Sequence, residues 1–205
     1  MPLSQLGRRS AQLILAVGLA YAGVLAVGMA RHGFSEPITD PILAVMEVLT
    51  IVSALPILTL FVAIHAAAPP NGRLPAMLGL LFAAMFACTT IGVHVVELTA
   101  GRALGRPGLV WPSVPYAIEL FAWDLLLGLA LLCAGGALPR TGATGRLILG
   151  LRLTGALCLA GLVGPLVGNM RLQLVGVFGY AICLPVVAWM LAGWFSRASP
   201  NASTP

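Results

Sequence analysis

Six long apolar runs dominate the sequence, and each is long enough to cross a lipid bilayer as a helix. One crossing needs about 20 mostly apolar residues. Lipid offers the backbone no hydrogen-bonding partner, and the runs do not alternate polar with apolar residues, so helices are favoured over a barrel. The sequence therefore predicts an all-α integral membrane protein, a bundle of six transmembrane helices. The runs cover residues 11–30, 42–67, 75–100, 115–138, 147–168 and 172–195.

The composition supports this prediction. Of the 205 residues, 60% are hydrophobic and only 8% are charged, and the mean hydropathy is +1.02. Soluble domains carry about 25% charged residues, so a water-soluble globular domain is excluded. Six spans use most of the length of the chain. We expect one transmembrane domain over residues 1–196 and a disordered polar tail over residues 197–205.

The basic residues indicate the orientation of the chain. All 11 are arginines scattered between the apolar runs, so they mark topology and form no surface for nucleic acid. Cytoplasmic loops carry the excess of basic residues. With a cytoplasmic N-terminus, that side receives Arg8, Arg9, Arg73, Arg140, Arg146, Arg152 and Arg197, and the other side receives Arg31, Arg102, Arg106 and Arg171. The sequence therefore predicts an N-in/C-in topology. The absence of lysine in a chain rich in Ala, Gly and Leu favours a bacterial inner membrane.

Four of the six acidic residues lie inside predicted spans. They are Glu47, Glu97, Glu119 and Asp124. An ionisable group within a membrane is energetically costly and is by default a functional candidate. At 1.5 Å per residue, these four groups and His94 lie roughly 5–14 Å below the non-cytoplasmic end of their helices. The predicted topology therefore brings five ionisable groups into one layer.

Acid and base chemistry is the first use that this layer suggests. A cluster of carboxyls in graded surroundings can hold one protonated and one ionised member. Asp124 is the deepest carboxyl and follows Trp123, so we expect it to be the acid. Glu97 or Glu47, nearer to Arg102, is the expected base, with His94 as a proton relay. These four residues are the candidate catalytic groups.

Further residues at the same level are candidates for ligand binding. Thr90 shares a helix face with His94 and Glu97. Glu119 lies about 140° around its helix from Asp124, so an undistorted α-helix cannot point both carboxyls the same way. Trp123 can shield positive charge in a transition state. The loop over residues 101–114 could cover the layer. The remaining candidates are Arg102, Arg106 and Trp111 in that loop and Asn169 between the last two runs.

Three functions remain open from the sequence. In the first, the acidic pocket opens to the outer leaflet and binds a small apolar or lipidic, isoprenoid-like ligand, with isomerisation or cyclisation as the possible chemistry. In the second, the polar groups only pair with one another, as in an accessory subunit of a membrane complex; Glu97 would pair with Arg102, and Glu119 with Arg106 or Arg171. In the third, the protein is a proton-coupled transporter, although it lacks a detectable internal repeat. The sequence does not decide whether the protein is an enzyme.

We expect no metal and no cofactor. His94 beside carboxylates lacks the repeated spacings of metal sites, and His65 is expected at the opposite end of the bundle, which excludes a haem pair. Besides the lipid bilayer, the sequence indicates a surface that could contact another protein. Small residues recur every four positions at Ala156, Ala160, Gly164 and Gly168, and such a ridge allows close approach of a second copy or of a partner membrane protein.

Overall fold

The computed structural model describes residues 2–33, 38–105 and 110–197. All the secondary-structure elements in these residues are helices. Six of its helices are long and apolar enough to cross a membrane, which confirms the all-α prediction. These spans are α1 (Leu3–His32), α2 (Ile42–Ala67), Pro70–Gly101 with α3 (Arg73–Val96), Val114–Ala137 with α4 (Val114–Leu120) and α5 (Leu127–Ala137), Gly145–Leu166 with α6 (Gly145–Gly161) and α7 (Val163–Leu166), and Met170–Arg197 with α8 (Met170–Phe178) and α9 (Leu184–Arg197). The predicted tail beyond residue 197 lies outside the described residues.

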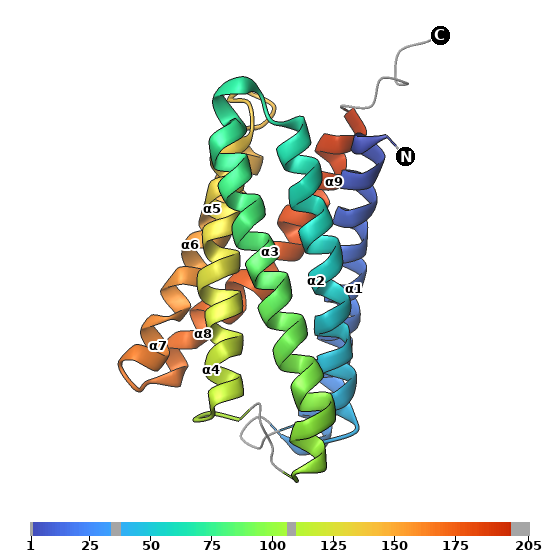
Figure 1. Ribbon diagram of the computed structural model, residues 1–205, viewed down its shortest axis with the longest axis vertical. Coiled ribbons are helices and arrows are strands. Elements are labelled where there is room, and N and C mark those ends of the chain that lie inside the picture. Colours follow the sequence, from blue (N-terminus) through green and yellow to red (C-terminus); the bar gives the residue numbers. More distant parts are fainter. Residues whose placement is uncertain (1, 34–37, 106–109, 198–205) are drawn as a thin grey trace.

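The helices form a closed bundle. Helices α1, α2 and α3 pack side by side in chain order, α5 packs between α3 and α6, and α9 packs against both α6 and α1. Figure 1 shows α8 and α9 crossing the bundle obliquely, from the corner at α7 to the end where α1 begins. The start of α1 and the end of α9 therefore lie at one end, and the start of α2 and the start of α4 lie at the other.

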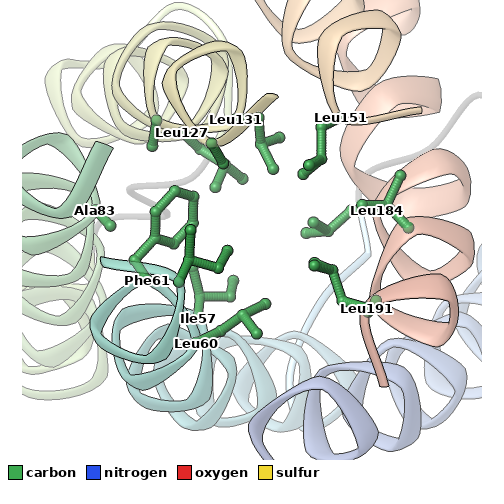
Figure 2. Packing of buried hydrophobic residues seen from close by; sticks show 14 of the residues in the cluster. Ile57, Leu60, Phe61, Ala83, Leu127, Leu131, Leu151, Leu184 and Leu191 are labelled. Carbon is green, nitrogen blue, oxygen red and sulfur yellow. The ribbon is translucent and has the colours of Figure 1, made fainter. Parts of the chain in front are cut away.

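The core between these helices is apolar. Figure 2 shows Ile57, Leu60, Phe61, Leu127, Leu131, Leu151, Leu184 and Leu191 converging from four spans. The outer surface is also rich in large apolar side chains, among them Leu19, Leu55, Leu81 and Trp189. A soluble monomer rarely exposes so much contiguous apolar surface. Together with the six candidate spans, this makes the chain a multi-pass membrane protein.

Glycines allow the helices of the second half to approach closely. A Cβ on Gly155 would lie 2.6 Å from the carbonyl oxygen of Gly128, where α6 meets α5. Of the predicted small-residue ridge, Gly164 packs within the chain, because a Cβ there would lie 2.6 Å from the backbone nitrogen of Gln173. The other three ridge residues, Ala156, Ala160 and Gly168, are exposed. The ridge is thus divided between an internal contact and the outer surface.

Three short π-helical segments interrupt the spans. They are η2 (Glu97–Gly101), η3 (Phe121–Leu126) and η4 (Gly179–Cys183). Hydrogen bonds in a π-helix run from i to i+5, and such turns are rare and frequent at functional sites. Each segment carries a polar side chain: Glu97 lies in η2, Asp124 in η3 and Tyr180 in η4. The apolar pattern of the sequence predicts regular α-helix in these spans, so the π turns are a difference from the prediction.

Candidate functional site

Arg102, just after the π turn η2, joins two spans near the end of the bundle. Its Nε donates to Asp40 Oδ2 and its Nη2 to Asp40 Oδ1, both at 2.8 Å. Its Nη1 donates to Glu47 Oε2 at 2.7 Å and to the main-chain oxygen of Glu97 at 3.0 Å. Two parallel hydrogen bonds to one carboxylate fix the orientation of a guanidinium group. Arg102 therefore ties the start of α2 to the end of the third span.

The two carboxylates that Arg102 holds are in different environments. The Glu47 side chain is 2% exposed, whereas that of Asp40 is 49% exposed and that of Arg102 is 28% exposed. Hydrogen bonds from Arg102 hold the pKa of Asp40 below its usual range. The same bonds, which Asp40 accepts, together with the one that Glu47 accepts, raise the pKa of the Arg102 guanidinium. Asp40, which lies just before α2, is thus part of an ion-pair network.

Glu119 on α4 is the centre of a second polar group. His94 Nε2 on α3 lies 2.9 Å from Glu119 Oε1. The indole nitrogen Nε1 of Trp123 donates to the same oxygen at 2.5 Å. Glu119 and Trp123 are four residues apart, so they lie on one helix face. The structure pairs His94 with Glu119, and Arg102 with Asp40 and Glu47.

Several polar atoms around this pair are buried and unpartnered. His94 Nδ1, Glu119 Oε2 and Thr90 Oγ1 have no hydrogen-bond partner among the described residues. Thr90 and His94 are buried, and the Glu119 side chain is 16% exposed. A buried polar atom without a partner costs free energy, so such atoms require an explanation. All three atoms lie on or beside the His94–Glu119 pair.

Aromatic rings surround the Trp123 indole. The ring of Phe86 lies 4.9 Å from it in an edge-to-face arrangement, and that of Tyr180 lies 5.1 Å from it. Tyr21 on α1 is near enough to Glu119 to interact with it electrostatically. Aromatic pairs of this kind add a modest stabilisation beyond the area that they bury. The pair is therefore flanked by an apolar, aromatic surface.

Asp124 faces a different pair of helices. Its side chain is fully buried, and neither carboxylate oxygen has a hydrogen-bond partner in the described part of the chain. A Cβ on Gly176 would lie 2.5 Å from Asp124 Oδ1, and a Cβ on Gly161 would lie 3.0 Å from it. Only glycine fits at these two positions of α8 and α6 without a shift. The Gln173 amide lies near enough to Asp124 to interact with it, and donates to the Tyr180 hydroxyl at 3.1 Å.

The other sequence candidates that the structure describes make separate contacts. The buried Glu97 places its carboxylate over Gly101 of its own π turn, where a Cβ would lie 2.9 Å from Oε2. Asn169 caps α8, where its side chain accepts a hydrogen bond from the Arg171 backbone nitrogen at 3.1 Å. The half-buried Trp111 has its ring 6.2 Å from that of Tyr116. Arg106 lies outside the described residues.

The structure adds residues that the sequence analysis did not single out. Gln173 and Tyr180 are seven positions apart, a spacing that places them on one helix face and could have drawn attention to them. The opposed glycines Gly161 and Gly176 have no sequence signal that connects them. Across residues 2–33, 38–105 and 110–197, no three His, Cys, Asp or Glu side chains group closely enough to hold a metal ion. Comparison with protein-family models, with curated proteins and with solved structures gives no match to this chain.

Proposed function

We propose that this multi-pass membrane protein binds a small apolar or lipidic ligand against the His94–Glu119 pair and carries out acid–base chemistry on it. One observation carries the proposal. His94 Nδ1, Glu119 Oε2 and Thr90 Oγ1 are buried and have no partner among the described residues. Because buried polar atoms are nearly always hydrogen-bonded, a bound molecule with its own polar group is a physical reason for these three to remain open.

The orientation is part of the proposal. Among the described residues, seven arginines belong to the end of the bundle where α1 begins and three to the other end, so the first end is assigned to the cytoplasm. The His94–Glu119 pair then lies in the outer half of the plasma membrane. A ligand that partitions into lipid would reach it from the outer leaflet, past the aromatic surface formed by Trp123 and Tyr21.

The geometry of the pair suggests a balanced proton exchange. His94 Nε2 and Glu119 Oε1 face each other, so Nδ1 and Oε2 are the atoms left for a ligand. His94 Nδ1 would donate a proton to one carbon of a C=C bond, which leaves a carbocation on the other carbon of that bond. Glu119 Oε2 would then accept a proton from the next carbon along the chain, and the electrons of that C–H bond form the new double bond. The double bond moves along the chain, and no proton or electron is gained or lost. A redox-neutral isomerisation of an isoprenoid-like chain fits this exchange.

The other buried carboxyls take supporting parts in this proposal. Glu47 is held by Arg102, which leaves it a fixed anion. Asp124 is enclosed between Gly161 of α6 and Gly176 of α8. We therefore assign the proton exchange to His94 and Glu119, and assign Asp124 to the packing of α6 against α8. Trp123 bridges the two regions through its hydrogen bond to Glu119 and its contact with Tyr180.

Photolabelling tests this proposal. The probe is farnesol carrying a diazirine, added to the full chain in vesicles of dioleoyl phosphatidylcholine. We expect labelled peptides from α3 and α4 in the unchanged protein, and at least a tenfold loss of that labelling in His94→Ala and Glu119→Gln. Ser10→Ala is the control, because it removes only the 2.7 Å hydrogen bond between Ser10 and Thr59 in another part of the bundle. Uniform labelling of lipid-facing residues, or labelling that both site variants leave unchanged, contradicts the proposal.

The accessory-subunit hypothesis gives a different result in the same experiment. If the polar groups serve only to fix the helices, Glu119→Gln lowers the free energy of unfolding and leaves probe labelling as it was. The protein would then also co-purify with another membrane protein. Measuring unfolding and labelling on the same preparations separates the two hypotheses.

A further inference from the structure

A basic groove lies at the end of the bundle where α1 begins and α9 ends, far from the His94–Glu119 pair. It has a volume of about 480 Å³ and is bounded by α1, by α9 and by the start of α6. Three arginines line it, one from each of these helices: Arg8, Arg146 and Arg197. All three side chains are exposed.

None of the described residues that line the groove is negatively charged. The five acidic residues that the structure describes all lie nearer to the opposite end of their spans, and none forms an ion pair with these arginines. Three guanidinium groups close to one hollow repel one another in the absence of an anion. A negatively charged molecule bound in the groove would therefore relieve this repulsion.

The walls of the groove change character with depth. Arg8 and Leu15 lie on one face of α1, seven residues and about 10 Å apart along the axis. On α9, Met190 and Trp189 lie seven and eight residues before Arg197, at a similar depth, whereas Leu147 follows Arg146 and lies at the level of the arginines. Arginines at the membrane surface and apolar side chains about 10 Å deeper match a molecule with an anionic head and hydrocarbon chains.

The floor of the groove is formed by small residues of α9. Ala192 and Gly193 line it, and Arg197 Nη1 lies 4.0 Å from the point that a Cβ on Gly193 would occupy. The Arg197 guanidinium therefore reaches back over the floor. Helices α1 and α6 both pack on α9, which lies between them, so the hollow is part of the helix arrangement.

We propose that this groove binds an anionic phospholipid, with the headgroup phosphate held by Arg8, Arg146 and Arg197 and the acyl chains lying along Leu15, Trp189 and Met190. Arginine holds a phosphate by two parallel hydrogen bonds, and clusters of basic residues beside membrane helices are the usual means of recognising anionic headgroups. The apolar wall distinguishes a lipid from free phosphate, which would use the guanidinium groups alone.

The experiment compares lipid binding by variants of equal charge. Full-length protein in detergent is titrated with dioleoyl phosphatidylglycerol, with dioleoyl phosphatidylcholine and with sodium phosphate, and bound lipid is counted by native mass spectrometry. The test variant is R8Q/R146Q. The matched control is R73Q/R140Q, which removes two exposed arginines at the same end of the bundle but outside the groove lining.

We expect the unchanged protein to bind phosphatidylglycerol in preference to phosphatidylcholine. R8Q/R146Q should lose roughly 30-fold in apparent affinity, because each arginine at a membrane surface contributes about 1 kcal/mol toward anionic lipid. R73Q/R140Q should stay within twofold of the unchanged protein. Gly193→Leu, which fills the floor and keeps every charge, should also weaken binding.

Three results would overturn the proposal. Equal losses in R8Q/R146Q and R73Q/R140Q would mean that surface charge alone attracts the lipid. Equal binding of the two phospholipids would mean that the headgroup charge is not recognised. Displacement of phosphatidylglycerol by millimolar sodium phosphate would mean that the apolar wall contributes nothing. Because the arginines are exposed, their replacement should leave folding intact, and thermal unfolding without added lipid checks this for every variant.

Discussion

At the end of the bundle where α2 begins, Arg102 contacts Asp40, Glu47 and the Glu97 main chain, and a buried carboxylate depends on it. At the end where α1 begins, Arg8, Arg146 and Arg197 line a hollow and pair with no described carboxylate. Arginines lie at both ends, but among the described acidic residues all those near an arginine are at the first end.

The difference shows what the surroundings of an arginine determine. Where a buried acid is near, the arginine compensates for a charge that the membrane interior would otherwise make costly, and its effect is on the stability of the chain. Where no acid is near, its charge remains available to a molecule from outside. The same side chain can therefore be structural at one end and ligand-binding at the other, and stability measurements can separate the two.

The largest expected effect concerns Arg102. Arg102→Ala leaves Glu47 buried and without its partner, so we expect the free energy of unfolding to fall by about 3–5 kcal/mol. R8Q/R146Q should change it by no more than about 0.5 kcal/mol in uncharged detergent, as expected for exposed positions. Reversible unfolding in mixed detergent micelles measures both values.

A second substitution sharpens the Arg102 result. Adding Glu47→Gln to Arg102→Ala removes the unpaired charge and should restore most of the lost stability. A loss in Arg102→Ala no larger than that in R8Q/R146Q would mean that the two ends do not differ. A loss that Glu47→Gln fails to reduce would mean that packing of the arginine stem, not its charge, holds this end together.

A smaller effect is expected at the glycine contact between α6 and α8. Gly176→Ala would place a Cβ 2.5 Å from Asp124 Oδ1, so we expect a loss of about 1–3 kcal/mol in the free energy of unfolding. Gly92→Ala is the control, since a Cβ on this exposed helical glycine meets no atom within 4 Å. It should be neutral or stabilise by up to about 1 kcal/mol through helix propensity.

The role of Asp124 in this contact can be tested in the same series. Asp124→Ala combined with Gly176→Ala should cost less than the sum of the two single substitutions, because the shorter side chain makes room for the new methyl group. Additive losses would mean that the Gly176 methyl clashes with the α6 backbone at Gly161 and not with Asp124. Equal effects of Gly176→Ala and Gly92→Ala would show that the close approach is absent.

The helices were predictable because length and apolar character alone decide whether a segment can span a bilayer. The level of the polar groups followed from counting along each helix, which needs only the rise per residue. The choice of partners was not predictable. His94 pairs with Glu119 on another span rather than with Glu97 on its own helix, and Asp40 reaches Arg102 from a loop.

Partner choice depends on how each helix is rotated about its axis, and the π segments change that rotation within three of the spans. The residues of Phe121–Leu126 show no pattern that predicts a π turn. The basic groove was missed for a related reason: Arg8, Arg146 and Arg197 are far apart in sequence and were counted only as topology signals. Their convergence depends on α9 lying between α1 and α6.

The smallest expected effect concerns the exposed partner of Arg102 and its dependence on pH. The pKa of Asp40 lies below its ordinary value of 3.8 in the folded chain, because Arg102 donates hydrogen bonds to it. Its contribution to stability is therefore fully present above pH 3.8 and is lost as the pH falls through the lower pKa of the folded state. Because the pair is exposed, Asp40→Asn should cost no more than about 1 kcal/mol at pH 6, less at high salt, and less at pH 2 than at pH 6. Unfolding of both proteins at the two pH values measures this difference. A cost at pH 6 as large as that of Arg102→Ala would mean that Asp40, and not the buried Glu47, is the carboxylate that makes this end depend on its arginine.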